Sequence, residues 1–224
     1  MSTYVITGAG SGIGAEIARR LREDGHDLVA IVRSQARAAE VAGPGVRTVV
    51  ADLESPETIA DALAPIAEET FAGLVHSAGV ADLGTVAETA SAVWSRTLTV
   101  NVVAVAEVTR VLLPALRRGH GDVVLLNSGA GLRTNPGWAA YAASKHALKA
   151  LADGLREEEP LLRVTSVYPG RTATPMQRGV REQEGGAFES ERYSDPGTVA
   201  GVVVSALLLP QDSRINDVTV RSRG

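Results

Sequence analysis

The first residues of the chain hold the feature that most restricts its fold, an apolar run leading directly into clustered glycines. Thr3 to Thr7 is β-branched and aromatic, which favours a strand, and a helical pattern follows over residues 13–23. Glycines between them let the backbone approach a pyrophosphate, and the free N–H groups of the first helical turn can bind it. The segment therefore predicts a dinucleotide site. Its expected phosphate-binding residues are Gly8, Gly10, Ser11, Gly12, Ile13 and Gly14.

The rest of the chain alternates strand-type runs with helical ones. Further strands are expected at residues 27–32, 46–50, 72–76, 123–128, 162–168 and 217–221, and further helices at 56–68, 90–118, 138–159 and 196–209. Such alternation forms a parallel sheet covered on both faces, with ligands at the carboxyl ends of its strands. The sequence thus predicts an α/β protein, a three-layer doubly wound Rossmann fold with a parallel sheet of about seven strands.

Length and composition limit the number of domains, the partners and the kinds of site that we expect. The chain has 224 residues with no repeat or linker, so we expect one domain over residues 1–224. A formal net charge of −4 argues against nucleic acid or an anionic membrane surface as a partner. With no cysteine and four scattered histidines, neither disulfides nor a metal site are expected. No signal segment or apolar run of membrane-spanning length is visible, so we expect a cytoplasmic protein.

A tyrosine and a lysine lie four residues apart in the expected helix at 138–159. At this spacing Tyr141 and Lys145 share one face of the helix. A phenol titrates near pH ~10, and a neighbouring ammonium favours its phenolate, which makes the phenol a tunable proton donor. Ser128 ends the preceding strand, where its hydroxyl can face that phenol. The spacing alone also fits an ordinary amphipathic helix, and the glycine turn upstream favours catalysis instead.

These motifs resemble those of the short-chain dehydrogenase/reductase family over nearly the whole chain. Residues 7–14 are similar to the family's TGxxxGIG turn, and Ser128 stands thirteen residues before the YxxxK motif. The resemblance implies that Tyr141 is the general acid or base, that Lys145 tunes it and contacts the nicotinamide ribose, and that Ser128 binds the substrate oxygen. Asn101 matches the fourth member of the catalytic tetrad, which holds a water. Its alternative is a helix-interior asparagine bonded to local backbone.

The same resemblance implies further contacts to the cofactor. Residues 169–174 are similar to the family's segment that holds the nicotinamide carboxamide, and Asp52 resembles the aspartate at the adenine. Where the family has Asn-Asn-Ala-Gly, this chain has His76-Ser-Ala-Gly79, and we expect His76 to be a hydrogen-bonded structural residue. The implied cofactor contacts are Asp52, Leu53, Ser77, Ala78, Gly79, Asn101, Tyr141, Lys145, Pro169, Gly170, Thr172 and Thr174.

The residues after the second strand indicate which dinucleotide is bound. An acidic residue at this strand end selects NAD, and here the position is Val32. Arg33 follows and can bind a 2′-phosphate by paired charge-assisted hydrogen bonds, to which Ser34 adds a hydroxyl and Arg37 a second charge. The alternative is that Arg33 is an exposed loop residue. We therefore predict that NADP(H) is preferred and that NAD(H) remains possible.

The predicted function is NADPH-dependent reduction of a carbonyl to a secondary alcohol, or the reverse reaction. Its alternatives are an NAD-linked alcohol dehydrogenase of the same fold and a catalytically silent NADP(H) sensor. Residues 171–194, polar and rich in Gly and Glu, are expected to form a mobile lid over a small-molecule substrate in place of a preformed pocket. Trp138 is interpreted as a packing residue, with the cleft wall as its alternative. The two long apolar helices predict a homotetramer, or failing that a dimer.

Overall fold

A parallel sheet of seven strands runs through the centre of the computed structural model, which describes residues 1–223. Its strand order is β3-β2-β1-β4-β5-β6-β7, with the reversal beside β1 that defines a doubly wound sheet. The predicted fold class is confirmed. The strands are β1 (Thr3–Thr7), β2 (Asp27–Val32), β3 (Val46–Val50), β4 (Gly73–His76), β5 (Asp122–Leu126), β6 (Arg163–Pro169) and β7 (Asp217–Val220).

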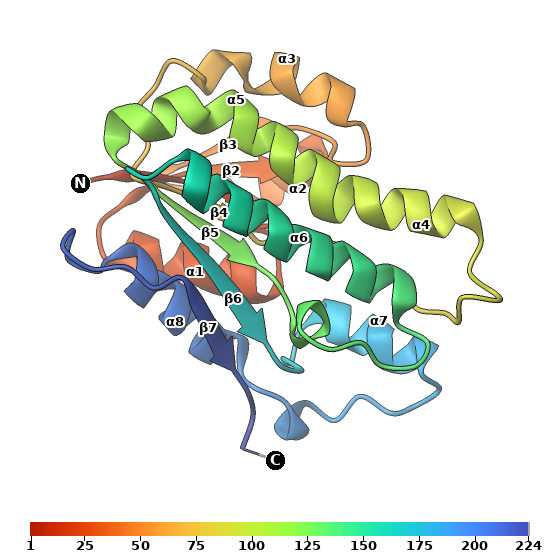
Figure 1. Cartoon of the computed structure of the whole chain (residues 1–224). Helices are drawn as coiled ribbons and strands as arrows, with labels where there is room; N and C mark the ends of the chain where they lie inside the picture. The colour runs from red at the N-terminus through yellow and green to blue at the C-terminus, as the bar shows by residue number, and fades with distance from the viewer. Residues whose placement is uncertain (224) are drawn as a thin grey trace.

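Helices cover both faces of the sheet (Figure 1). One face carries α3 (Ile59–Leu63), α5 (Ala104–Gly119) and α6 (Ala139–Glu158). The opposite face carries α1 (Gly12–Glu23), α2 (Gln35–Val41) and α8 (Pro196–Leu207). The remaining helical segments are α4 (Ser91–Leu98), α7 (Pro175–Gln183), a π-helical turn at Thr99–Val103 and short 3-10 turns at Pro56–Thr58, Ala64–Ile66, Gly129–Gly131 and Ser190–Arg192.

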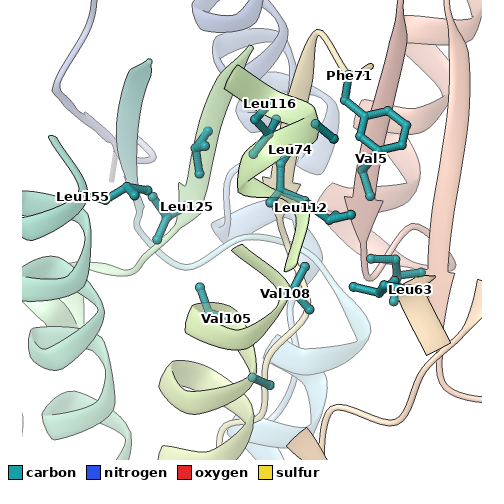
Figure 2. Packing of buried hydrophobic residues seen from close by; sticks show 14 of the residues in the cluster. Val5, Leu63, Phe71, Leu74, Val105, Val108, Leu112, Leu116, Leu125 and Leu155 are labelled. Carbon is teal, nitrogen blue, oxygen red and sulfur yellow. The ribbon is translucent and has the colours of Figure 1, made fainter. Parts of the chain in front are cut away.

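The central strands contribute alternate residues to two separate cores. Val5 and Leu74 pack with Leu112 and Leu116 of α5 on one face (Figure 2). The next residue, Ile6, faces the opposite core with α1 and α8. Because both faces are covered, central strands such as β2 (DLVAIV) and β5 (DVVLL) are almost entirely apolar, which made them visible in the sequence as short continuous runs.

The long helix predicted at 90–118 is a rod of three segments, α4, the π-helical turn and α5. Over Ser91–Gly119 it has the length and apolar composition to cross a membrane, so the expectation that no segment reaches that length is wrong. In the structure 44% of its most apolar window is buried, and α5 covers the sheet. The buried part of this apolar helix therefore belongs to the core on that face of the sheet.

Two helices were absent from the sequence-based prediction. Ser34 caps α2, where its Oγ accepts a hydrogen bond from the Arg37 N–H at 3.3 Å. Thr174 caps α7 in the same way, and Pro175 occupies the first helical position. The first half of the segment 171–194, which was expected to be a mobile lid, thus contains a capped helix, and the mobility of the segment stays a prediction. Gln177 and Val180 are the buried residues of α7.

Candidate active site

A cleft of about 830 Å³ runs along the carboxyl ends of the strands. Because the strands are parallel, the turns that follow them meet at this edge in the order of the sheet. Asp52 and Arg33 follow β3 and β2, the glycine turn follows β1, Ser128 follows β5 and Arg221 follows β7, and all of them line the cleft. The cleft therefore joins the predicted dinucleotide and catalytic residues in one continuous space.

The glycine turn is held against the loop after β4. The Thr7 hydroxyl accepts hydrogen bonds from the Ser77 and Ala78 N–H groups at 3.1 and 3.2 Å. Gly8 has a φ of +73°, and a Cβ there would lie 2.8 Å from the Ala78 nitrogen. A Cβ on Gly14 would overlap the Gly8 carbonyl oxygen, and Gly14 does not line the cleft. Gly8 therefore serves the turn and Gly14 the close packing of helix on strand.

The Tyr141 and Lys145 side chains lie on the buried, cleft-facing side of α6. Tyr141 is 6% exposed and Lys145 5%. The Lys145 Nζ donates to the Leu126 carbonyl oxygen at 2.9 Å and stands 5.8 Å from the centroid of the Tyr141 ring. Because burial penalises its charged form, the pKa of Lys145 is lowered to about 8. The ammonium thus remains the main form at neutral pH.

The Tyr141 phenol differs from the sequence-based expectation in its ionisation. Burial raises its pKa, and the side-chain hydrogen bond with Ser128 opposes that rise. Lys145 was expected to lower the pKa, but its nitrogen is committed to the Leu126 carbonyl and the loss of water around the phenolate dominates. In this state the phenol holds its proton at neutral pH.

Asn101 is buried behind the cleft wall and does not line the cleft. Its Oδ1 accepts from the Val80 N–H at 2.9 Å, and its Nδ2 donates to the Val80 carbonyl at 2.9 Å and to the Ser144 Oγ at 3.0 Å. The Ser144 hydroxyl donates in turn to the Tyr141 carbonyl at 2.7 Å. The π-helical turn thereby joins the loop after β4 to the helix that carries the phenol. The Asn101 side chain bonds the backbone of Val80, which is distant in sequence, and not the local backbone of the alternative interpretation. The water-holding role of Asn101 stays a prediction.

Asn127 is a site residue that sequence reasoning missed. It is 5% exposed, its Nδ2 donates to the Lys145 carbonyl at 3.0 Å, and its Oδ1 accepts from the Ser128 N–H at 2.8 Å. One amide thus fixes the backbone of Ser128 relative to the turn of α6 that carries Lys145. The only signal in the sequence was an amide residue directly before the serine.

The end of the cleft at β2 and β3 carries mixed charges. Arg33 is exposed there, and Leu53 also lines the wall. Glu54 lies close enough to Arg33 for that cation to contribute to lowering the pKa of its carboxyl, after the larger effect of its hydrogen bond with Arg96. Arg37 lines the cleft and pairs with Glu40, whereas Ser34 caps α2 and does not line it. The arrangement keeps Arg33 available to a phosphate. The Ser34 hydroxyl, which was expected to bind that phosphate, caps α2 instead.

His76, at the position where the resembled family has its first asparagine, is a structural residue. It is 2% exposed, and its Nε2 lies 2.9 Å from the Thr109 Oγ1, whose own proton goes to the Val105 carbonyl. Burial lowers the pKa of His76 to about 3, so the ring is neutral and its Nε2 donates to Thr109. The prediction of a hydrogen-bonded structural histidine is confirmed.

The opposite end of the cleft is built by Trp138 and by α7. The Trp138 ring stands edge-on to the Tyr141 ring at 5.8 Å between centroids, and the Arg171 guanidinium lies 5.6 Å from the Trp138 ring centroid. Trp138 lines the cleft, so its interpretation as a packing residue alone is wrong. Arg171 also pairs with Glu184 just beyond α7 at 2.6 Å. Contrary to the expectation of no preformed pocket, this end has a defined wall.

Most of the predicted cofactor residues share this cleft. Those on its wall are Gly8, Gly10, Ser11, Gly12, Ile13, Arg33, Asp52, Leu53, Ser77, Ala78, Gly79, Tyr141, Lys145, Pro169, Gly170, Thr172 and Thr174. Within residues 1–223, no three His, Asp or Glu side chains gather in a way that could hold a metal ion.

Comparisons with known proteins extend over almost the whole chain. The family model for short chain dehydrogenases matches residues 2–185. An uncharacterized oxidoreductase of Staphylococcus epidermidis is 30% identical over 97% of this chain and 95% of its own length. The alcohol dehydrogenase of the archaeon Thermococcus sibiricus, solved with 5-hydroxy-NADP, is 26% identical with a TM-score of 0.90 over 100% of this chain and 97% of its own. A short chain dehydrogenase of Burkholderia cenocepacia, solved with NADP, is 26% identical with a TM-score of 0.84 over 99% and 88%.

Proposed function

Because the chain belongs to the short-chain dehydrogenase/reductase family, we propose that it reduces a carbonyl to a secondary alcohol with NADPH, or catalyses the reverse. The observation that carries this proposal is the single cleft shared by the glycine turn and by Ser128, Tyr141 and Lys145. A dinucleotide site alone would require no buried phenol and ammonium. Their presence beside that site favours an enzyme over a silent sensor.

The cleft wall fits a dinucleotide. The backbone of the glycine turn is uncovered, since α1 begins with Gly12 and has no acidic residue in its first turn to repel a phosphate. The Ser11 side chain caps no backbone group and so remains available. The Pro169–Gly170 turn and Asp52 line the same wall at its two ends. When bound, the dinucleotide supplies the hydride or accepts it.

Tyr141 moves the proton at the substrate oxygen. Since burial raises the pKa of this phenol, it is protonated at neutral pH and can donate to a carbonyl oxygen as charge develops there. Ser128 presents its hydroxyl to the same oxygen and fixes the orientation of the carbonyl. Lys145, charged below pH about 8, places a cation close to the phenolate that is left. This protonation state supports reduction as the direction favoured at neutral pH.

NADP(H) is the preferred cofactor in this proposal. Arg33 is exposed on the wall of the cleft where the adenosine end of a dinucleotide lies, and no acidic residue replaces it at the end of β2. The similar proteins of T. sibiricus and B. cenocepacia, both solved with NADP-type ligands, support this choice. An NAD-linked dehydrogenase is the alternative, and a comparison of kcat/KM for the two cofactors separates them.

The proton donor is tested with a panel of aldehydes and ketones under saturating NADPH. Tyr141→Phe removes the transferable proton and little volume, so kcat should fall by at least ~10²-fold while NADPH still binds. Lys145→Ala should lose turnover and also weaken NADPH binding. A Tyr141→Phe enzyme with wild-type kcat would exclude the phenol as the proton donor.

The proposed assembly is a homotetramer, or failing that a dimer. On the face of the rod formed by α4, the π-helical turn and α5, Val103 is 50% exposed although it is apolar. Closed symmetry with isologous contacts is the usual way in which soluble proteins cover such a face.

A further inference from the structure

The order of the strands separates the part of the cleft that holds the cofactor from the part left to the substrate. Arg33 follows β2, the glycine turn follows β1, and Ser128 follows β5. A dinucleotide laid along this edge reaches the catalytic phenol from the β2 side. The Pro169–Gly170 turn, Thr172 and Thr174 are expected at the cofactor. The wall beyond them, built by the loop after Ser128, by Arg171 beside Trp138 and by the end of β7, is therefore the substrate end of the cleft.

Three arginines line this substrate end. Arg133 lies in the loop after β5, Arg171 follows β6, and Arg221 follows β7. Among the described residues, the acidic side chains that line the cleft are Asp52 and Glu54, both at the opposite end beside β3. The substrate end is thus positive in a chain whose formal net charge is −4. A cleft lined by one sign of charge concentrates ligands of the other sign.

The three guanidinium groups differ in their partners. Arg171 is neutralised by Glu184, which also pairs with Arg181 at 2.5 Å. For Arg133 and Arg221, no side-chain hydrogen bond or ion pair occurs within residues 1–223. A guanidinium nitrogen of Arg221 lies 3.5 Å from the position that a Cβ on Gly129 would take, next to Ser128. Two uncommitted cations therefore stand on the substrate side of the catalytic hydroxyl.

A buried donor without a partner lines the same cleft. Gln177 on α7 is 8% exposed, and its Nε2 has no hydrogen-bond partner in the structure. A buried amide N–H that stays unpaired is costly, so a ligand that offers an acceptor oxygen is favoured here. Gln177 belongs to the first turn of α7, and Thr174, which caps that turn, would lie 3.1 Å from a Cβ on Gly12 of the glycine turn. This donor therefore bears on the oxygen-rich dinucleotide, and the assignment of the substrate rests on the arginines.

We propose that the substrate carries a carboxylate or another oxyanion, which Arg133 and Arg221 bind while its carbonyl meets Ser128 and Tyr141. The inference rests on the proposed reductase function and adds the substrate class. A guanidinium matches the two oxygens of a carboxylate or a phosphate group by paired hydrogen bonds. The Trp138 ring beside the phenol offers an apolar surface for the carbon skeleton between the two ends of the substrate.

The first test compares keto acids with their methyl esters as substrates for NADPH consumption. A series with the carboxylate one, two or three bonds from the ketone covers the unknown spacing, and keto phosphonates distinguish phosphate-type oxyanions. The best acid should exceed its ester in kcat/KM by about 10-fold to 100-fold, the range for a hydrogen bond to a charged group. If the esters have the same kcat/KM as every acid and phosphonate, the assignment is overturned.

Variants locate the effect on the two arginines. Arg221→Gln and Arg133→Gln should each lower the ratio of acid to ester kcat/KM by about 10-fold, and the double variant by more. Arg19→Gln is the matched control, because Arg19 on α1 is 49% exposed, lies outside the cleft and carries the same charge. An acid-to-ester ratio that falls equally in the Arg19 control would assign the effect to net charge and overturn the site.

A binding measurement separates this inference from the proposed reaction. Calorimetry with the NADP⁺-loaded protein uses benzoate and phenylphosphate as anionic probes and benzamide as the neutral one. Tighter binding of an anion, lost in the double variant, supports the site even if no ketone in the panel is reduced, a result that would count only against the proposed function. Equal binding of benzoate, phenylphosphate and benzamide would overturn the site while leaving NADPH-dependent reduction intact.

Discussion

Replacing Arg33 tests which dinucleotide the protein uses. Val32 is the last residue of β2 and is 7% exposed, and Arg33 follows it on the cleft wall. Arg33→Ile removes the cation that is expected to bind the 2′-phosphate. Adding Val32→Asp supplies a carboxylate that accepts hydrogen bonds from the ribose hydroxyls of NADH and repels that phosphate.

The expected magnitude follows from the exposure of the site. A hydrogen bond between charged groups contributes about 1.5–3 kcal/mol, and salt screening at an exposed guanidinium favours the lower end. About 1.5 kcal/mol corresponds to a factor of ~10 in kcat/KM between NADPH and NADH. Glu54 offsets part of the positive potential, since its carboxylate lies near Arg33 and pairs with Arg96. Glu54→Gln should therefore increase the preference for NADPH.

The assay is kcat/KM for NADPH and NADH at 0.02 M and 0.2 M salt with one fixed carbonyl substrate. In the wild type the ratio should favour NADPH and shrink at high salt, and the double variant should reverse it. Arg110→Ile is the control, because Arg110 is an exposed arginine on α5 that does not line the cleft. Equal kcat/KM for both cofactors in the wild type, or an NADPH-to-NADH ratio that stays the same in the double variant, would refute the assignment of Arg33.

Three further measurements test other parts of the site and of the assembly. The pKa of Lys145 is lowered to about 8, and its charged form assists the proton transfer. The kcat/KM for reduction should therefore be level below that pH and fall above it. Lys145→Arg should abolish this fall at high pH. A profile that stays level to pH 10 would contradict the role of the ammonium. Asn101→Ala leaves the Val80 N–H and carbonyl without partners and removes the hydrogen bond that the Ser144 Oγ accepts. It should cost ~2–4 kcal/mol of unfolding free energy in urea, against less than ~0.5 kcal/mol for Ser95→Ala on the exposed side of the same rod. Light scattering at micromolar concentration should give four times the mass of one chain, or twice, and a monomer would exclude both.

The strands and the cleft were predictable because each has a strong local signal. Buried strands such as β1 and β5 are short apolar runs bounded by glycine or polar residues. The glycine turn, Ser128 and Tyr141 all stand next to such elements, so a parallel sheet alone brings them to one edge. The sequence could therefore indicate which residues meet without indicating their distances.

The missed features depend on contacts that are distant in sequence. The helix α7 buries only Gln177 and Val180, too few apolar positions for a helical period, although Thr174 and Pro175 formed a start signal. The π-helical turn has no local signature, and its buried Asn101 is held by Val80 and by α6. The raised pKa of Tyr141 depends on burial, which spacing along a helix does not report.

The order of strands in the sheet has a consequence for how changes to this protein combine. Arg33 lies at the end of β2 and Arg221 at the end of β7, and β1, β4, β5 and β6 separate these two strands. Free-energy effects of substitutions at well-separated sites without shared partners add to within about 0.5 kcal/mol. A double-mutant cycle between the two arginines should then show no coupling. The preference for NADPH over NADH and the preference among substrates could accordingly change one at a time, by natural variation or by design, without one limiting the other.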